Sequence, residues 1–73
     1  MKELCEKYPA LEVPAVYVKI MANEIKSWAK MLDNIKHIKN AIYTDFKANI
    51  SCIGLTPEDY EAVIKWFCDT MEY

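Results

Sequence analysis

The fold is decided by the stretch Val13 to Ile50, VPAVYVKIMANEIKSWAKMLDNIKHIKNAIYTDFKANI, which contains neither Gly nor Pro after Pro14. On a helical wheel, with about 100° per residue, ten apolar side chains fall on one side. They are Tyr17, Met21, Ile25, Trp28, Met31, Leu32, Ile35, Ile38, Ile42 and Phe46. Lysine, asparagine and other polar residues occupy the opposite side. This pattern predicts an amphipathic helix over about residues 15–48 with a single buried stripe.

The length of this helix leaves two alternatives open. A continuous helix would be about 50 Å long at 1.5 Å per residue, whereas a chain of 73 residues folds to a diameter of about 30 Å. The helix could break near residues 33–40, with Asp33-Asn34 or Asn40 at the corner, and form a three-helix bundle. Alternatively, it could stay whole, with a second copy of the chain covering the remainder.

A second helix is predicted over residues 57–72. Thr56 is an N-cap residue, Pro57 occupies the first helical position, and Glu58 and Asp59 place negative charge at the positive end of the helix dipole. Apolar residues then recur at steps of three and four, which indicates a buried seam. The seam consists of Tyr60, Val63, Ile64, Phe67, Cys68 and Met71.

The remaining segments are short. Residues 2–8 predict a helical turn ended by Pro9, because the residue before a proline is disfavoured in the α region. We expect an extended link over residues 10–13 and a loop over residues 49–55, which holds the only glycine, Gly54. Together these patterns predict an all-α protein, a small helical bundle forming one domain over residues 1–73.

Composition narrows the function classes. The formal charge is −2, and all nine basic side chains are lysines. Arginine supplies the bidentate contacts that read guanine and clamp phosphate, so its absence counts against specific nucleic-acid recognition. The N-terminus lacks the apolar run of a signal peptide, and we expect a soluble cytoplasmic protein. The abundance of Lys, Ile, Asn and Tyr suggests an AT-rich gene, as in low-GC bacteria and their phages.

The residues that could carry chemistry are few and dispersed. His37 is the only histidine, and Cys5, Cys52 and Cys68 form no close-spaced pair. We expect free thiols, with one disulfide plus a spare thiol as the alternative. Cys52 is the best candidate nucleophile for a thiol enzyme, but no pattern places a base beside it. We therefore predict no catalytic residues, no metal and no cofactor, and a protein that is not an enzyme.

The predicted function is binding to another protein, as a small regulator or inhibitor of phage or low-GC bacterial origin. The candidate interface residues are Trp28, Leu32, Ile35, Trp66 and Tyr73. A homodimer is expected because the C-terminal helix covers only about half of a continuous long helix. The alternative is a small helical DNA-binding regulator. In that case a corner near Asn34 or Asn40 would create a helix-turn-helix, and Lys19, Lys26 and Lys30 would contact phosphate.

Overall fold

The computed structural model describes residues 1–27 and 32–73, with the side chains of 1–27 and 35–73. Its elements, in chain order, are α1 (Lys2–Lys7), the 3₁₀ helix η1 (Pro9–Leu11), α2 (Glu12–Ser27), α3 (Leu32–Ser51) and α4 (Pro57–Met71). No strand occurs in the part of the chain that is described. The prediction of an all-α bundle is therefore confirmed.

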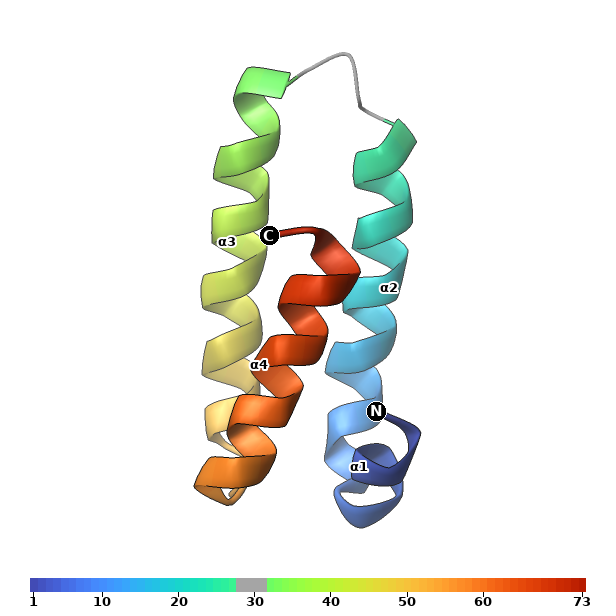
Figure 1. Ribbon diagram of the computed structural model, residues 1–73, viewed down its shortest axis with the longest axis vertical. Helices are drawn as coiled ribbons and strands as arrows, with labels where there is room; N and C mark the ends of the chain where they lie inside the picture. Colours follow the sequence, from blue (N-terminus) through green and yellow to red (C-terminus); the bar gives the residue numbers. More distant parts are fainter. Residues whose placement is uncertain (28–31) are drawn as a thin grey trace.

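The three long helices form an elongated bundle that measures 38 × 18 × 16 Å. α2 and α3 lie side by side and run in opposite directions, and α4 packs against both of them (Figure 1). Of the two alternatives that the sequence left open, the continuous helix is therefore wrong and the three-helix bundle is correct. The predicted corner is also wrong, because Asp33, Asn34 and Asn40 all lie within α3.

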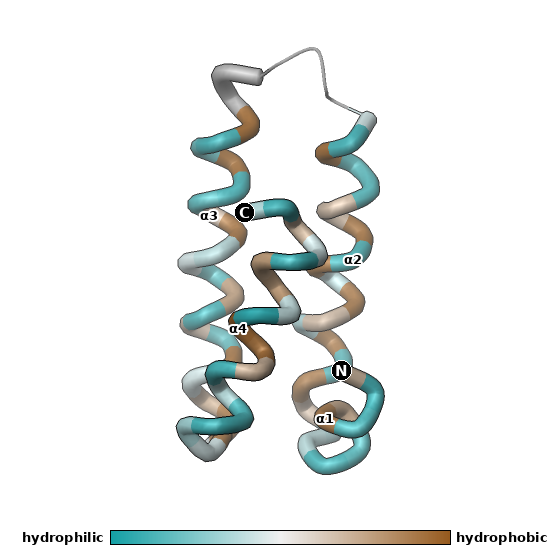
Figure 2. The backbone as a smooth tube through the Cα atoms, viewed as in Figure 1, coloured by the Kyte–Doolittle hydropathy of each residue, from teal (hydrophilic) through white to brown (hydrophobic). Residues whose placement is uncertain are grey.

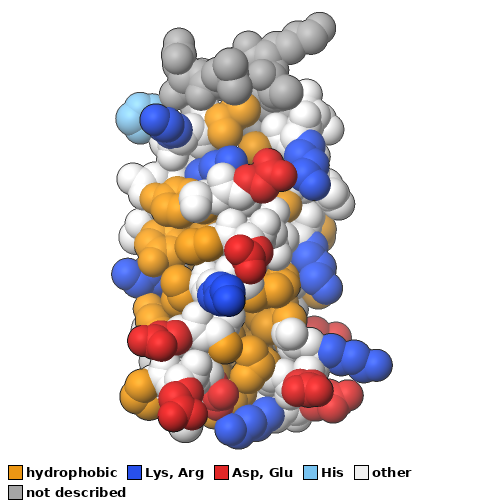
Figure 3. Space-filling view, viewed as in Figure 1, with side chains coloured by type: hydrophobic (Ala, Val, Ile, Leu, Met, Phe, Trp, Pro, Cys, Tyr) orange, Lys and Arg blue, Asp and Glu red, His pale blue; other side chains and the backbone are white. Residues whose placement is uncertain are grey.

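Apolar and polar residues alternate along each long helix with the period of a helix, as the hydropathy colouring shows (Figure 2). On the face that carries α4, basic and acidic side chains are dispersed among apolar ones (Figure 3). Each helix can therefore bury one side and leave charged side chains in water.

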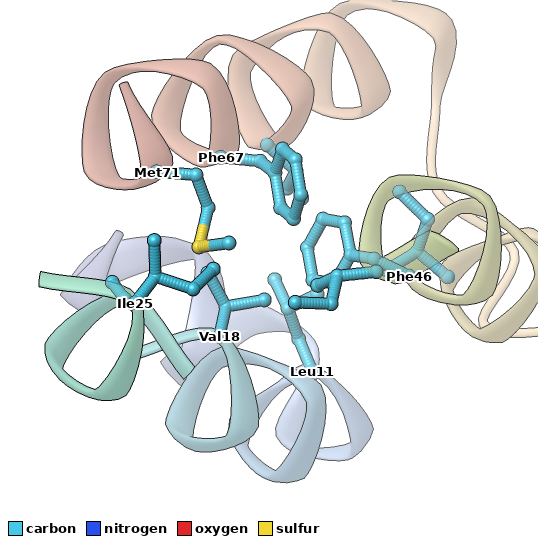
Figure 4. Close-up of a cluster of buried hydrophobic side chains, with 10 residues drawn as sticks. Leu11, Val18, Ile25, Phe46, Phe67 and Met71 are labelled. Carbon is cyan, nitrogen blue, oxygen red and sulfur yellow. The ribbon is translucent and has the colours of Figure 1, made fainter. Parts of the chain in front are cut away.

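The core lies where α2, α3 and α4 meet. Side chains from all three helices, and Leu11 from η1, point toward one another there (Figure 4). The rings of Phe46 and Phe67 stack with centroids 5.0 Å apart and an interplanar angle of 21°. The largest fully buried side chains are Phe46, Phe67, Leu11, Ile50, Val18 and Val63. These residues join η1, α2, α3 and α4 in one core.

α4 begins as the sequence predicts. The Thr56 hydroxyl oxygen accepts a hydrogen bond from the Asp59 backbone N–H at 3.2 Å, and Pro57 occupies the first turn. Val63, Phe67 and Met71 are buried. The helix ends at Met71, one residue earlier than predicted, because Glu72 adopts a left-handed conformation with a φ of 54°.

Two of the predicted connecting segments are shorter than expected. The predicted extended link over residues 10–13 is wrong, because η1 leads directly into α2 at Glu12. The predicted loop over residues 49–55 is wrong in its first half, because α3 continues to Ser51. Burial of Ile50, which has no exposed surface, explains this extra turn. Gly54 has a φ of 84°, a conformation that glycine adopts without steric cost.

The buried side of α2 differs from the predicted one. Tyr17 was expected in the core but is 45% exposed, whereas its neighbour Val18 is completely buried. α2 contacts α3 and α4 through Ala15, Val18, Ala22 and Ile25. The two alanines are small enough to let helices approach closely. Ile25 was predicted on the buried side and is buried, and Met21 packs against the core. The centre of the buried side is therefore shifted by about 80° from the predicted one.

Candidate protein-binding surface

The outer side of α2 carries a row of exposed apolar side chains, which we call the outer stripe. It consists of Val13, Val16, Tyr17 and Ile20, with exposed fractions of 77%, 47%, 45% and 52%. Their spacing places them on one side of a helix over two turns. Among the described residues only one other large apolar side chain, Tyr73, is as exposed. The exposed apolar surface is thus concentrated on one helix.

The outer stripe lies almost opposite the side of α2 that faces the core. With about 100° per residue, the centres of the two sets are separated by about 170°. A band of exposed polar residues runs along one edge of the stripe and consists of Glu12, Lys19, Asn23 and Lys26. A helix that is apolar on opposite sides is typical of a helix covered by neighbours on both sides. The chain's own bundle covers only one of them.

A groove adjoins the outer stripe between the first turns of α2 and the last turns of α3. Its volume is about 690 Å³, and Val13 and Tyr17 line it on the α2 side. Asp45, Asn49 and Cys52 line it on the α3 side. The groove and the stripe share Val13 and Tyr17, so they form a continuous surface. The side chains that line the groove are mostly apolar, and the carboxylate of Asp45 lies at its α3 edge.

Two of the predicted interface residues, Trp66 and Tyr73, contact other aromatic side chains of the chain's own bundle. The Trp66 ring, half-buried, lies 6.3 Å from the Phe46 ring and belongs to the edge of the core. Tyr73 stacks on Tyr43 with centroids 5.1 Å apart. The hydroxyl of Tyr73 donates a hydrogen bond to the side-chain oxygen of Asn40. Both aromatic residues therefore have contacts within the chain's own bundle.

The other predicted interface residues lie along α3 and before it. Ile35 is half-buried and packs against the core. Ile35 and Tyr73 both line a shallow pocket of about 410 Å³. Trp28 and the side chain of Leu32 lie outside the described residues. A homodimer was expected because the C-terminal helix would have covered only half of a continuous long helix. α2 and α3 are separate helices, so this argument no longer applies.

The candidate catalytic and metal-binding residues do not come together in the structure. All three cysteines are free, so the disulfide alternative is wrong. Cys52 is exposed, and its thiol lies 3.7 Å from the carbonyl oxygen of Ala48. His37 is exposed on α3. Within the described residues no three His, Cys, Asp or Glu side chains gather in a way that could hold a metal ion.

The helix-turn-helix hypothesis does not match the helix boundaries. It required a corner at Asn34 or Asn40, and both lie inside α3. Lys19 and Lys26 are exposed on α2, but Lys30 lies outside the described residues. The two described lysines belong to the polar band beside the outer stripe.

A polar cluster attaches the N-terminal segment to the first turn of α4. The Tyr8 hydroxyl and the Lys7 ammonium donate to the same oxygen of Asp59, at 2.7 Å and 2.9 Å. The hydrogen bond from Tyr8, followed by that from Lys7, lowers the pKa of Asp59 below its ordinary value of 3.8. The carboxylate in turn raises the pKa of Lys7 above 10.5. The Asp59 side chain is 19% exposed, and the cluster holds α1 in place.

The prediction from sequence missed the outer stripe for an identifiable reason. Between Val13 and Ala22 apolar residues are nearly continuous, so more than one set satisfies a helical period. The apolar residues that the first stripe leaves over include Val13, Val16 and Ile20, which together with Tyr17 have the spacing of a second helical stripe. Only the packing of α3 and α4 decides which set is buried.

No family model, no curated protein and no solved structure matches this chain. In the described part of the chain, no helix combines the length and the apolar character needed to cross a membrane. A function is therefore inferred from the residues and their geometry.

Proposed function

We propose that this chain is a small, non-enzymatic protein-binding regulator that acts through the outer stripe of α2. One observation carries the proposal: α2 has apolar side chains on two nearly opposite sides, and its own bundle buries only one of them. Inhibition of the bound protein is a mode of action consistent with so small a chain. Binding, rather than catalysis, is the activity that such a surface can perform.

The form of the surface supports a helical partner. Burying a large apolar side chain stabilises a complex by roughly 1.5–3 kcal/mol, and the outer stripe offers four such side chains on one rigid helix. The adjoining groove adds a concave wall beside Val13 and Tyr17. Amphipathic helices bind surfaces of this kind through anchors at steps of three and four residues. A tyrosine at the centre of the contact is typical of interfaces.

Site-specific photo-crosslinking in the source cell tests the proposal. A photoreactive phenylalanine analogue is placed at Val16, in the stripe, or at Ala62, an exposed position on α4. We expect an adduct of discrete mass from position 16 and none from position 62, because only the stripe is covered in the complex. Equal labelling from both positions, or no discrete adduct from position 16, would contradict the proposal.

A further inference from the structure

We infer that the outer stripe binds the outer stripe of a second copy of this chain, with the two α2 helices antiparallel. The inference rests on the proposed function, since it names the partner of the same surface. It is carried by two properties of α2: the stripe is complementary to itself under a two-fold rotation, and so are the charges beside it.

The apolar residues match one another when the two-fold axis passes between Val16 and Tyr17. In that register, Val16 of each copy faces Tyr17 of the other, and Val13 faces Ile20. All four positions are exposed, so the outer stripe of each copy can contact the outer stripe of the other. A closed two-fold contact of this kind is the commonest way in which identical chains associate. Because α2 begins at Glu12, residues 12–21 of the two copies overlap in this register, and the paired segment is about 15 Å long.

The charges provide an independent reason for this pairing. Glu12 and Lys19 are exposed and lie on the same edge of the stripe, one residue before Val13 and Ile20 respectively. Rotation about a two-fold axis perpendicular to the helices keeps that edge on the same side in both copies. When Val13 faces Ile20 of the other copy, Glu12 comes beside Lys19 of the other copy. Two reciprocal ion pairs result, within reach of long side chains at the usual helix separation of about 8–10 Å.

The size of the contact sets its strength. One helix from each copy gives an interface at the small end of the known range, so we expect a dissociation constant of about 1–100 µM. The formal charge of −2 per chain is too small for repulsion between copies to prevent association. The protein should therefore exchange between monomer and dimer as its concentration changes.

Light scattering or sedimentation over about 1–500 µM measures this equilibrium. We expect the mass to rise from the 8.5 kDa of one chain toward that of two. Ile20→Glu should weaken the dimer more than 100-fold, because it places a carboxylate in the contact twice. Ala62→Glu adds the same charge at an exposed position on α4 and should change the dissociation constant less than about twofold.

Charge reversal tests the antiparallel register and does not depend on an apolar substitution. Glu12→Lys alone and Lys19→Glu alone should each weaken the homodimer about tenfold, because like charges then face each other. An equimolar mixture of the two variants restores opposite charges at both contacts. It should form a heterodimer at least as tight as the wild-type dimer. Circular dichroism confirms that each variant remains helical.

Each contrary result identifies what fails. A wild-type mass of one chain at every concentration overturns the second copy as the partner, and so does a dimer that survives Ile20→Glu. A dimer that the charge variants do not weaken, or a mixture that stays monomeric, overturns the antiparallel register. If the chain is monomeric but Val16 still crosslinks to another protein, the inference fails while the proposed function stands.

Discussion

At the scale of single residues, Asp59 performs two tasks. Its backbone N–H completes the cap with Thr56, and its carboxylate accepts hydrogen bonds from Tyr8 and Lys7. The first contact is local and could be predicted from the sequence. The second joins residues more than 50 positions apart, and only the fold brings them together.

The pKa of Asp59 should respond to the loss of either donor. In the wild-type protein it lies below 3.8, and Tyr8→Phe should raise it because the largest stabilising hydrogen bond of the carboxylate is removed. Lys7→Met should also raise it. An NMR titration of the Asp59 carboxyl carbon measures the change. A titration curve that is identical in all three proteins would show that the cluster does not form in solution.

Stability should depend on pH through the same group. Because the folded-state pKa of Asp59 is lowered, its contribution is complete above about pH 4 and is lost as the pH falls through the folded pKa. For Lys7 the folded pKa is raised, so its contribution is complete below pH 10.5 and is lost as the pH rises through the folded value. Between pH 5 and pH 2, the melting temperature should fall more in wild type than in Asp59→Asn. Asp45→Asn, which removes an exposed carboxylate on α3, should retain the wild-type slope.

At the scale of elements, α4 illustrates how local signals and tertiary packing agree. Thr56, Pro57 and the acids of the first turn define its beginning, and the seam Val63, Phe67, Met71 defines its buried side. Both were predicted because they depend on residues close together in the chain. For α2 the local signals are ambiguous, since apolar residues occur almost all round its first half.

Loss of the N-cap of α4 and loss of a core ring should lower the free energy of unfolding by different amounts. Thr56→Ala should lower the free energy of unfolding by about 1 kcal/mol, the usual value for an N-cap. Phe67→Ala should lower it by about 3–5 kcal/mol, because the ring is fully buried against Phe46. Thr44→Ala, in an exposed position of α3, is the control and should change stability by less than about 0.5 kcal/mol. Urea melts in which Thr56→Ala is the most destabilised would show that the cap matters more than the core.

At the scale of the whole molecule, the reversal between α2 and α3 determines which surfaces are buried. It brings Val18 and Ile25 to Phe46, Phe67 and Met71, and it leaves the outer stripe in water. A continuous helix would instead have exposed the middle of its stripe. The surface available to a partner thus follows from the topology, and it lies on a different part of the chain from the predicted interface.

The two sides of α2 can be separated by a pair of matched substitutions. Val18→Glu should abolish helical folding, because the carboxylate would be buried among apolar side chains with no partner. Ile20→Glu should retain the helix content of the wild type, because position 20 is half exposed. Far-ultraviolet circular dichroism of the two purified variants measures the difference. Unfolding by Ile20→Glu and tolerance of Val18→Glu would reverse the assignment of the sides.

The sequence by itself determined the all-α class, the short N-terminal helix, and the cap, first residue and seam of α4, because these depend on residues within a few positions of one another. It left open whether residues 15–48 form one helix or two, and it misplaced Tyr17. The tertiary structure decided both. A helix with apolar residues on opposite sides can bury either side. For α2, the free energy that selects the buried side comes from packing against α3 and α4. The candidate binding surface is the side that this selection leaves exposed.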